Sequence, residues 1–520
     1  MIFLKKNIIN SLILFLGFFI ILLTLWITKI FGKNVYYVEI LYNIHVGYEG
    51  FKNSPNTYKI DFALYTVFPA LFLSVLTIYI CRKIKNILSF SQTQKKYLWL
   101  NKYNNILRTL YYNRYLKILL FNYSAFLIYS SLFFLLQFGF FEYFEKNARY
   151  EDYPNLYKNP YSIKYNEPID KKNLILFYVE SLEYDVSKLS NKNKSNPIQP
   201  FNEIKGKNIY DFKHAPSTSF SIAGVVASQC SLPFNVVINS NLNKIPKEKL
   251  FCLSDVLAKQ NYDQVFYISV DKQFQSFGAF KERHGYEVND VNVIKKDLKL
   301  IEKPSNEMAW GGGVYDSALL NHAKKEIIKK HNAGKKFNFT IINTDTHHPY
   351  GYSPECLIGD ISTESLQAHE AYKCSGTIIK KFFDDLDHMG ILENTLVVIM
   401  GDHLAYRDLM GSLNKQEKRN VYFKINSDKN FTRTKLNHFD VAPTILDELG
   451  ILPGNIKQFG FGISLFQDKD KFNYNNHYNL VMRSDILSNF YIRRLLKFVP
   501  PARTDGLDPG PNAKMIKTND

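Results

Sequence analysis

The chain has 520 residues, of which 46% are hydrophobic, and carries 65 lysines and arginines against 48 acidic residues, a net charge of +17. This length exceeds one typical domain and suffices for a sizeable buried core. A nucleic-acid-binding protein would concentrate its basic excess beside a recognition motif, and the sequence shows no such motif. Much of the excess lies instead in one short segment, residues 82–117.

Three apolar runs, at residues 8–28, 62–81 and 118–141, predict a transmembrane domain of three helices over residues 1–141. None of the runs contains a charged residue, and each is about the ~20 residues that a helix needs to cross a bilayer. The first run is too long for a signal peptide, and no small-residue cleavage site follows it. We therefore expect a retained anchor.

The loops between these runs predict their orientation. Residues 82–117 contain many lysines and arginines and no acidic residue, whereas the loop at residues 32–60 has both signs. The positive-inside rule places the basic loop in the cytoplasm. With three spans, everything after residue 141 then lies on the outer side of the membrane.

Four of the five cysteines fall in this exported part, which favours disulfides. Four cysteines permit three connectivities, and sequence proximity alone favours Cys230–Cys252 and Cys356–Cys374. In the chain-entropy model each bond would stabilise the domain by roughly 3 kcal/mol. The alternative is four buried free thiols.

After the third span, residues 142–172 form a polar linker, and an alternation of short apolar runs and amphipathic helices begins at residue 173. Strands are predicted at residues 173–179, 264–270, 337–343, 395–400 and 421–425, and helices at 253–261, 314–331, 367–390 and 438–449. This alternation indicates an α/β domain over residues 173–499, whose central sheet is mostly parallel and covered by helices on both faces. The tail, residues 500–520, is predicted to be disordered.

Two of these strands end in residues that bind divalent metals. Glu180 follows the strand at 173–179, and Asp402 and His403 follow the strand at 395–400. Open α/β sheets bind ligands outside the carboxyl ends of their strands, so the three side chains should converge. Each alone is a weak signal, but two carboxylates and an imidazole together suit a cation such as Zn²⁺ or Mn²⁺.

A hydroxyl side chain at the open position of such a metal becomes a nucleophile at neutral pH. The candidates are Thr218, Ser219 and Ser221. We favour Ser221 because it directly precedes a helix-like run, residues 222–228, whose N-terminus would favour a bound phosphate. The alternative is that Ser221 is only the N-cap of that helix.

Four further residues are candidates for substrate binding and proton transfer. His347 and His348 follow the strand at 337–343. A histidine there can protonate a leaving alkoxide or hold a phosphate oxygen, and we expect one of the pair to be structural. Trp310 could form an aromatic wall of the cleft, and Arg283 could place a cation near it, with a surface turn as the alternative.

Seven segments resemble the membrane-anchored branch of the alkaline phosphatase and sulfatase superfamily, which includes lipoteichoic acid synthases and lipid A phosphoethanolamine transferases. They are residues 221–233, 252–257, 284–286, 345–349, 402–405, 414–420 and 444–449. The sequence is most similar to the phosphoglycerol transferases that modify osmoregulated periplasmic glucans. The resemblance covers roughly residues 173–452.

The resemblance implies that Glu180, Asp402 and His403 bind one divalent ion, Mn or Zn first and Mg as a further candidate. Ser221 would be both the nucleophile and a metal ligand, although relatives usually carry threonine at its place. The family's substrate histidine stands two residues before a proline, which selects His347.

The same resemblance places Trp310 in the lipid headgroup pocket, with His348 and Arg283 as further substrate-binding candidates. It implies a multi-pass protein of the bacterial inner membrane, whose periplasmic domain transfers phosphoglycerol from phosphatidylglycerol to a glucan through a covalent intermediate on serine.

Three alternatives to this function remain open. The first is phosphoethanolamine transfer to lipid A or another envelope acceptor, although the lipid A enzymes carry a further histidine soon after the Asp-His pair and residues 404–411 have none. The second is a hydrolase, but residues 221–225 lack the Cys/Ser-x-Pro-x-Arg context of formylglycine sulfatases. The third is a non-catalytic envelope-binding protein.

Overall fold

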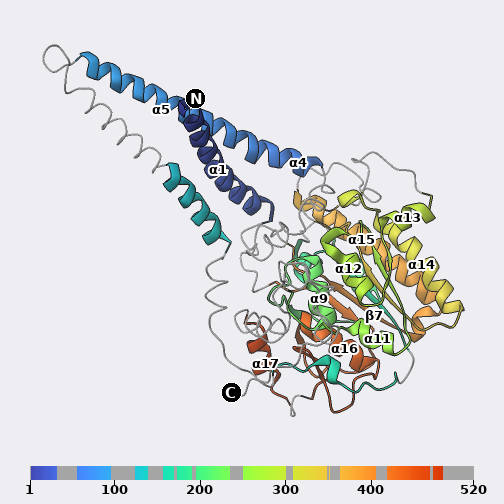
Figure 1. Ribbon diagram of the computed structural model, residues 1–520. Coiled ribbons are helices and arrows are strands. Elements are labelled where there is room, and N and C mark those ends of the chain that lie inside the picture. Colours follow the sequence, from blue (N-terminus) through green and yellow to red (C-terminus); the bar gives the residue numbers. More distant parts are fainter. Residues whose placement is uncertain are drawn as a thin grey trace, which may run out of the picture.

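The computed structural model describes residues 2–31, 56–94, 123–138, 156–168, 172–189, 195–234, 250–299, 309–347, 351, 364–405, 419–468 and 472–483. Within these ranges, long apolar helices near the N-terminus extend away from an α/β domain (Figure 1). The predicted disordered tail, residues 500–520, lies outside the described residues.

The apolar helices agree in part with the predicted spans. They are α1 (Ile2–Phe31), α4 (Asn56–Phe62), the π-helix η1 (Ala63–Val67), α5 (Phe68–Gln94) and the helix Tyr123–Gln137. Two segments, Ser11–Thr28 and Lys59–Ile80, are long and apolar enough to cross a membrane. The helix Tyr123–Gln137 is shorter, and the rest of the predicted third span, except Phe138, lies outside the described residues.

Close aromatic contacts join these helices to one another. The rings of Phe18 and Phe126 lie 4.9 Å apart, and those of Trp26 and Phe62 lie 5.2 Å apart. A Cβ atom added at Gly17 would stand 2.5 Å from the ring of Phe126. The small residue therefore lets α1 approach the helix Tyr123–Gln137 closely, as is typical of helix packing in membranes.

The α/β domain is built on a seven-stranded sheet in the order β2-β8-β7-β1-β6-β4-β5. Its strands are β1 (Asn173–Val179), β2 (Lys207–Asn208), β4 (Asp263–Ile268), β5 (Glu287–Asn289), β6 (Phe337–Ile342), β7 (Thr395–Gly401) and β8 (Phe423–Ile425). The strands β7, β1, β6, β4 and β5 run parallel to one another. At one edge β8 pairs antiparallel with β7, and β2 pairs antiparallel with β8. The predicted mostly parallel sheet is confirmed.

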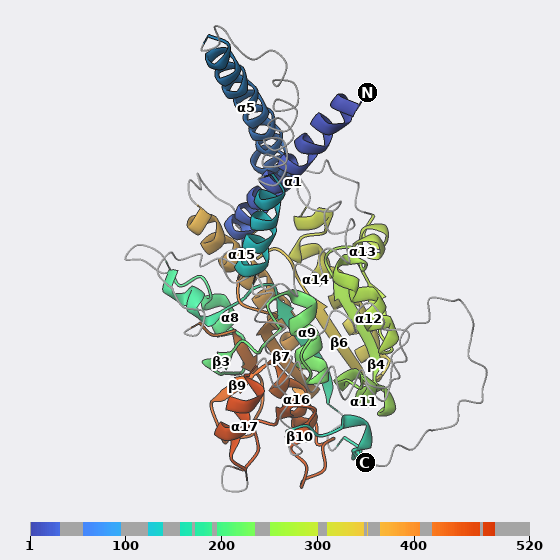
Figure 2. The ribbon, with the colours of Figure 1, turned by 60° about the vertical axis from the view of Figure 1, so that its left-hand side comes forward.

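Helices cover both faces of this sheet (Figure 2), as predicted. On one face lie α9 (Ser221–Cys230), α11 (Leu253–Lys259), α12 (Phe277–Arg283) and α16 (Val441–Glu448), and on the other lie α8 (Gln199–Glu203), α13 (Val291–Asp297), α14 (Asp316–Asn332) and α15 (Glu364–His388). Residues of β1 alternate between the two cores, because successive side chains of a strand point to opposite faces. All of β1 is consequently buried.

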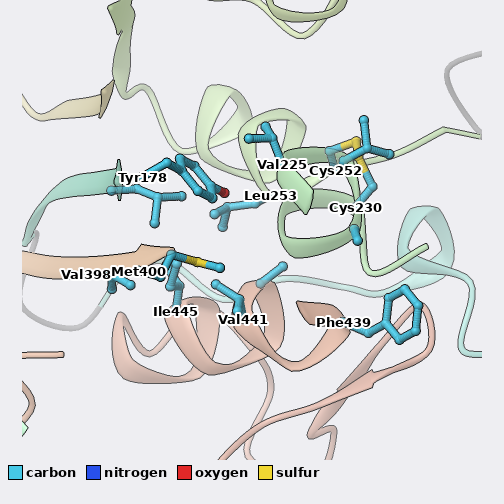
Figure 3. Packing of buried hydrophobic residues seen from close by; sticks show 14 of the residues in the cluster. Tyr178, Val225, Cys230, Cys252, Leu253, Val398, Met400, Phe439, Val441 and Ile445 are labelled. Carbon is cyan, nitrogen blue, oxygen red and sulfur yellow. A yellow bond between two sulfur atoms is a disulfide. The ribbon is translucent and has the colours of Figure 1, made fainter. Parts of the chain in front are cut away.

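The first of these cores packs α16 against the strands that carry the site. Figure 3 shows Tyr178 of β1 with Val398 and Met400 of β7 on the sheet side, and Val441 and Ile445 of α16 opposite. All five side chains are fully buried. This packing fixes the ends of β1 and β7 on a rigid platform.

Smaller elements complete the C-terminal side of the domain. They are β3 (Asp211–Lys213), β9 (Lys435–Asn437), β10 (Gln458–Phe459), β11 (Gly462–Ile463) and α17 (Tyr474–Val481). Part of the predicted linker also packs here: Leu156 and Ile163 are buried, and Lys158 forms an antiparallel bridge with Gly460. The packed domain therefore includes residues before the predicted boundary at residue 173.

The predicted disulfide between Cys230 and Cys252 is present, and it joins the end of α9 to the start of α11 (Figure 3). Cys374 is also disulfide-bonded and buried. Its predicted partner, Cys356, lies outside the described residues.

Candidate active site

The metal-binding candidates leave the sheet side by side. The parallel register pairs Val179 of β1 with Gly401 of β7, so the residues that follow, Glu180 and Asp402, emerge at the same edge. One ligand atom each from Glu180, Asp402 and His403 lies within 4.8 Å of the others. The structure thus brings together the three residues that the sequence predicts to converge.

The hydroxyl of Ser221 lies in this cluster. Its Oγ donates a hydrogen bond of 3.0 Å to Glu180 Oε2 and lies 3.5 Å from His403 Nε2. The N-cap of α9 is Phe220, whose own side chain makes no capping hydrogen bond. The interpretation of Ser221 as the cap is therefore wrong: it is the first helical residue, and its hydroxyl points to the cluster.

The two rival hydroxyls are placed differently. Thr218 Oγ1 donates to the carbonyl of Ala215 at 2.6 Å. Ser219 Oγ is buried without a hydrogen-bond partner among the described residues. The contact with Glu180 therefore favours Ser221 among the three candidates.

The oxygens and nitrogens of the cluster are only partly satisfied. Asp402 Oδ1 accepts from the main-chain N–H groups of Ser181 and His403, at 2.8 and 2.9 Å. Asp402 Oδ2 is buried and, within the described residues, has no hydrogen-bond partner. His403 Nδ1–H donates to the carbonyl of Leu404 at 2.7 Å, which leaves Nε2 facing the carboxylates. A buried acceptor without a partner is costly, so this arrangement fits a bound cation.

The charges of the cluster lead to the same inference. Burial raises the pKa of Glu180, but the charges of His347 and His403 outweigh burial and hold that pKa below its usual range. Burial and the Glu180 charge raise the pKa of Asp402 to about 7. Burial alone would lower the pKa of His403, but the charges of the two carboxylates outweigh burial and raise that pKa to about 10. Without a metal, bound protons offset the negative charge of the carboxylates. A divalent ion would replace those protons.

Residues that the sequence analysis did not single out hold Glu180 in place. The main-chain N–H of Glu180 donates to Asn343 Oδ1 at 2.9 Å, and its carbonyl accepts from Thr346 Oγ1 at 2.6 Å. The next residue, Ser181, has a left-handed backbone with φ 56°, and its carbonyl accepts from Tyr372 at 2.9 Å. The only sequence signal was the place of Asn343 at the end of a predicted strand.

The main chain of Asp402 is held from the opposite side. His438 donates from Nε2 to the Asp402 carbonyl at 2.8 Å and accepts at Nδ1 from the Ala215 N–H at 3.3 Å. Burial lowers the pKa of His438 to about 3, so the ring is neutral. A Cβ atom at Gly224 of α9 would stand 1.9 Å from the same carbonyl, so only glycine allows this approach.

An aromatic stack borders the cluster. The rings of His347 and Trp310 are stacked with centroids 3.6 Å apart, and Phe274 packs against Trp310 edge-on at 5.3 Å. His347 Nε2 lies 4.0 Å from Glu180 Oε1. The structure therefore places His347 next to Glu180 of the cluster, and Trp310 against His347.

The other two substrate candidates stay predictions. His348 lies outside the described residues. Arg283 is the last residue of α12 and is half-buried. Gln275 was not anticipated: its Oε1 accepts from the Ile222 N–H at the N-terminus of α9, at 2.9 Å.

Residues 172–451 match the Sulfatase family. The chain belongs to this family. It is 30% identical over 309 residues to phosphoglycerol transferase I of Escherichia fergusonii, covering 56% of this chain and 39% of that protein. For the same enzyme of Citrobacter koseri the identity is 29% over 313 residues, covering 58% and 40%. The chain thus spans about two fifths of the length of the curated relatives it matches.

Solved structures with a similar fold include the lipoteichoic acid synthase LtaP from Listeria monocytogenes, with 16% identity and a TM-score of 0.47, covering 62% of this chain and 79% of that one. A second is the integral membrane lipooligosaccharide phosphoethanolamine transferase A from Neisseria meningitidis, with 13% identity and a TM-score of 0.47, covering 86% and 84%.

Proposed function

We propose that this protein is a metal-dependent phosphotransferase that moves phosphoglycerol from phosphatidylglycerol to a periplasmic glucan. The observation that carries the proposal is the hydrogen bond from Ser221 to Glu180, inside a cluster where Asp402 Oδ2 has no hydrogen-bond partner among the described residues. Membership of the Sulfatase family and the identity to phosphoglycerol transferase I support it.

Glu180, Asp402 and His403 would hold one divalent ion, with the Ser221 oxygen as a further ligand. Two carboxylates and one imidazole suit Mn²⁺ or Zn²⁺ better than Mg²⁺, which prefers oxygen ligands alone. The ion would neutralise charge that develops on the phosphoryl oxygens, a contribution of several kcal/mol.

In the first step, Ser221 Oγ, whose proton would leave to solvent when the ion binds, attacks the phosphorus of phosphatidylglycerol as the alkoxide, and the bond from phosphorus to the diacylglycerol oxygen breaks. The contact with Glu180 holds the Ser221 side chain toward the cluster for this attack. His347 gives a proton to the leaving oxygen, so diacylglycerol departs neutral. Phosphoglycerol remains esterified to Ser221.

In the second step, a glucan hydroxyl attacks the same phosphorus and the ester to Ser221 breaks. His347 takes the proton of the incoming hydroxyl, which restores its starting state. The stacking of His347 on Trp310 fixes the plane of the imidazole for both transfers.

The apolar helices would keep the domain beside its lipid donor. Ser11–Thr28 and Lys59–Ile80 have the length and composition of membrane spans, and the predicted third span would complete a multi-pass anchor. The basic loop after the second span favours a cytoplasmic loop and a periplasmic domain at the bacterial inner membrane. The disulfide between Cys230 and Cys252 agrees with that oxidising compartment.

The test is headgroup transfer by the full chain in vesicles that contain labelled phosphatidylglycerol or labelled phosphatidylethanolamine, with periplasmic glucan as the acceptor. We expect glucan labelling from phosphatidylglycerol, a phosphoglyceryl adduct on Ser221 by intact mass, and loss of both in Ser221→Ala. Labelling from phosphatidylethanolamine alone would instead support the phosphoethanolamine alternative.

A further inference from the structure

Arg419 is a buried arginine that contacts both chain segments carrying the metal-binding candidates. It is 4% exposed. Its Nε donates to Glu183 Oε2 at 2.6 Å, and Nη2 donates to the other oxygen of the same carboxylate. Nη2 also donates to the carbonyl of Ala405 at 2.9 Å. One guanidinium therefore joins two segments that are far apart in the sequence.

The two contact points stand at the same sequence offset from the candidate metal ligands. Glu183 stands three residues after Glu180, and Ala405 stands three residues after Asp402. Neither contact point belongs to the cluster itself. Arg419 thus links the segment that follows Glu180 to the segment that follows Asp402.

The backbone around Arg419 is anchored to the first segment. Val421 forms an antiparallel bridge with Glu183, and the Tyr184 N–H donates to the Asn420 carbonyl at 2.8 Å. The Asn420 N–H donates to Asp185 Oδ2, also at 2.8 Å. The contact with Ala405 is therefore made by the side chain reaching from a fixed base toward the second segment.

We propose that Arg419 is a positioning residue that sets the spacing of Glu180 against Asp402 and His403 and so determines the metal affinity of the site. The inference rests on the proposed metal-dependent function. Burial raises the pKa of Glu183, and the Arg419 guanidinium opposes that shift, so the pair is a buried charge contact that resists displacement. Partners one step removed from a metal typically change its affinity by about 10- to 100-fold.

The fork of an arginine is needed for this geometry. A lysine could keep the positive charge, but its single ammonium does not present two parallel donors to a carboxylate and a third to a carbonyl in one plane. Arg419→Lys should therefore loosen the link between the two segments while it leaves the buried charge in place.

Arg433 provides a matched control within the same domain. It is 8% exposed, its Nη2 lies 3.5 Å from Asp440 Oδ1, and it donates to the carbonyls of Lys435 and Ile463. Like Arg419 it is a buried arginine that binds one carboxylate and main-chain carbonyls. Among the described residues it is hydrogen-bonded to neither Glu180–Glu183 nor Asp402–Ala405.

The experiment compares the full chain in detergent with its Arg419→Lys, Arg419→Met and Glu183→Gln variants and with Arg433→Lys. Mn²⁺ affinity is measured by competition with a chelator, the visible spectrum is recorded at saturating Co²⁺, and unfolding is measured without metal. We expect Arg419→Lys to weaken Mn²⁺ binding by about 10- to 100-fold and to shift the cobalt bands. Arg433→Lys should lower the unfolding temperature and leave Mn²⁺ affinity within about twofold.

A folded Arg419→Lys variant with wild-type Mn²⁺ affinity and an unchanged cobalt spectrum would overturn the proposal. If Arg419→Met does not fold, Arg419→Lys and Glu183→Gln decide. Asp402→Asn distinguishes a failure of the proposed metal site from a failure of the proposed role of Arg419. If wild type and Asp402→Asn bind Mn²⁺ equally, the metal site itself fails; if only Asp402→Asn is impaired, the site stands and the role of Arg419 fails.

Discussion

Two buried clusters in this domain have similar compositions and different chemistry. One contains Glu180, Asp402 and His403, and the other contains Cys252, Asp255 and His284; in each, three candidate ligand atoms lie within 4.8 Å of one another. By residue type alone, both clusters could hold a metal ion.

The second cluster is internally satisfied. Asp255 Oδ2 accepts from the Cys252 N–H and pairs with His284 Nδ1, both at 2.8 Å. The sulfur of Cys252 is bonded to Cys230 and is not a thiolate that could bind a metal. In the first cluster, by contrast, Asp402 Oδ2 has no hydrogen-bond partner among the described residues and only approaches His403 Nε2 at 3.6 Å. A carboxylate oxygen without a hydrogen bond, rather than the residue composition, distinguishes the first cluster from the second.

Helix α9 connects the clusters. Its first residue, Ser221, bonds to Glu180, and its last, Cys230, forms the disulfide with Cys252. The satisfied cluster anchors the C-terminus of the helix, and the unsatisfied cluster meets its N-terminus. We infer that the Cys252 cluster braces the helix that carries Ser221, the proposed nucleophile, to the Glu180 cluster.

The largest contrast should come from removing one carboxylate charge in each cluster. Asp402→Asn keeps the shape of the side chain but removes a carboxylate of the candidate metal site, so Mn²⁺ affinity should fall by more than about 100-fold, roughly 3 kcal/mol. Asp255→Asn should destabilise the fold and leave the affinity unchanged. Equal losses of Mn²⁺ binding in the two variants, measured by chelator competition, would contradict the distinction between the clusters.

Removing the disulfide should affect stability first. Replacing Cys230 and Cys252 by alanine opens the loop between residues separated by 22 positions. The free energy of unfolding should fall by about 3 kcal/mol because the unfolded chain gains entropy. Denaturant unfolding gives this value. Mn²⁺ affinity of the folded fraction should persist, and its loss would show that the brace and the metal site are one unit.

Gly224 tests how closely α9 must approach the metal cluster. A methyl group there would stand 1.9 Å from the Asp402 carbonyl, whereas at Gly454 no atom of the described residues lies within 4 Å of the added carbon. Gly224→Ala should therefore destabilise the protein by about 2 kcal/mol and reduce phosphoglycerol transfer. Gly454→Ala is the control for both measurements. Wild-type behaviour of Gly224→Ala would mean that α9 has room to move.

The sequence predicted the parts of the site that repeat a simple rule. Apolar runs identified β1, β6 and β7, because buried parallel strands are apolar on both faces. Functional residues then followed at the strand ends, as for Glu180 and Asp402. The same reasoning placed Ser221 at the start of α9. The alternative interpretation of Ser221 as the N-cap was wrong, because a cap and a first helical residue differ by one position and one backbone angle.

The supporting contacts were beyond such reasoning. Asn343, His438 and Arg419 act on main-chain or carboxylate atoms that are distant in sequence, and their residue types are common in loops. Only the packed fold shows which polar atoms they satisfy. The satisfied state of the Cys252 cluster was equally hidden, since it depends on which atoms of Asp255 and His284 meet.

The smallest effect concerns the neutral histidine behind the metal cluster. Burial lowers the pKa of His438 from 6.5 to about 3, so the folded protein keeps the ring neutral while the unfolded chain protonates it below pH 6.5. The unfolded state then binds more protons, and stability falls as the pH drops, by about 1.4 kcal/mol per pH unit for this group between pH 6.5 and 3.

His438→Gln should remove this pH dependence of the free energy of unfolding, because an amide does not titrate yet can still donate to the Asp402 carbonyl. We therefore expect the variant to be less stable than wild type at pH 7.5 and to approach or exceed it near pH 5, in unfolding measured with a chelator present. Parallel pH profiles for the two proteins would mean that His438 is protonated in the fold. The carbonyl of Asp402 would then accept a hydrogen bond from a charged ring, and a charged histidine would hold the Glu180 cluster.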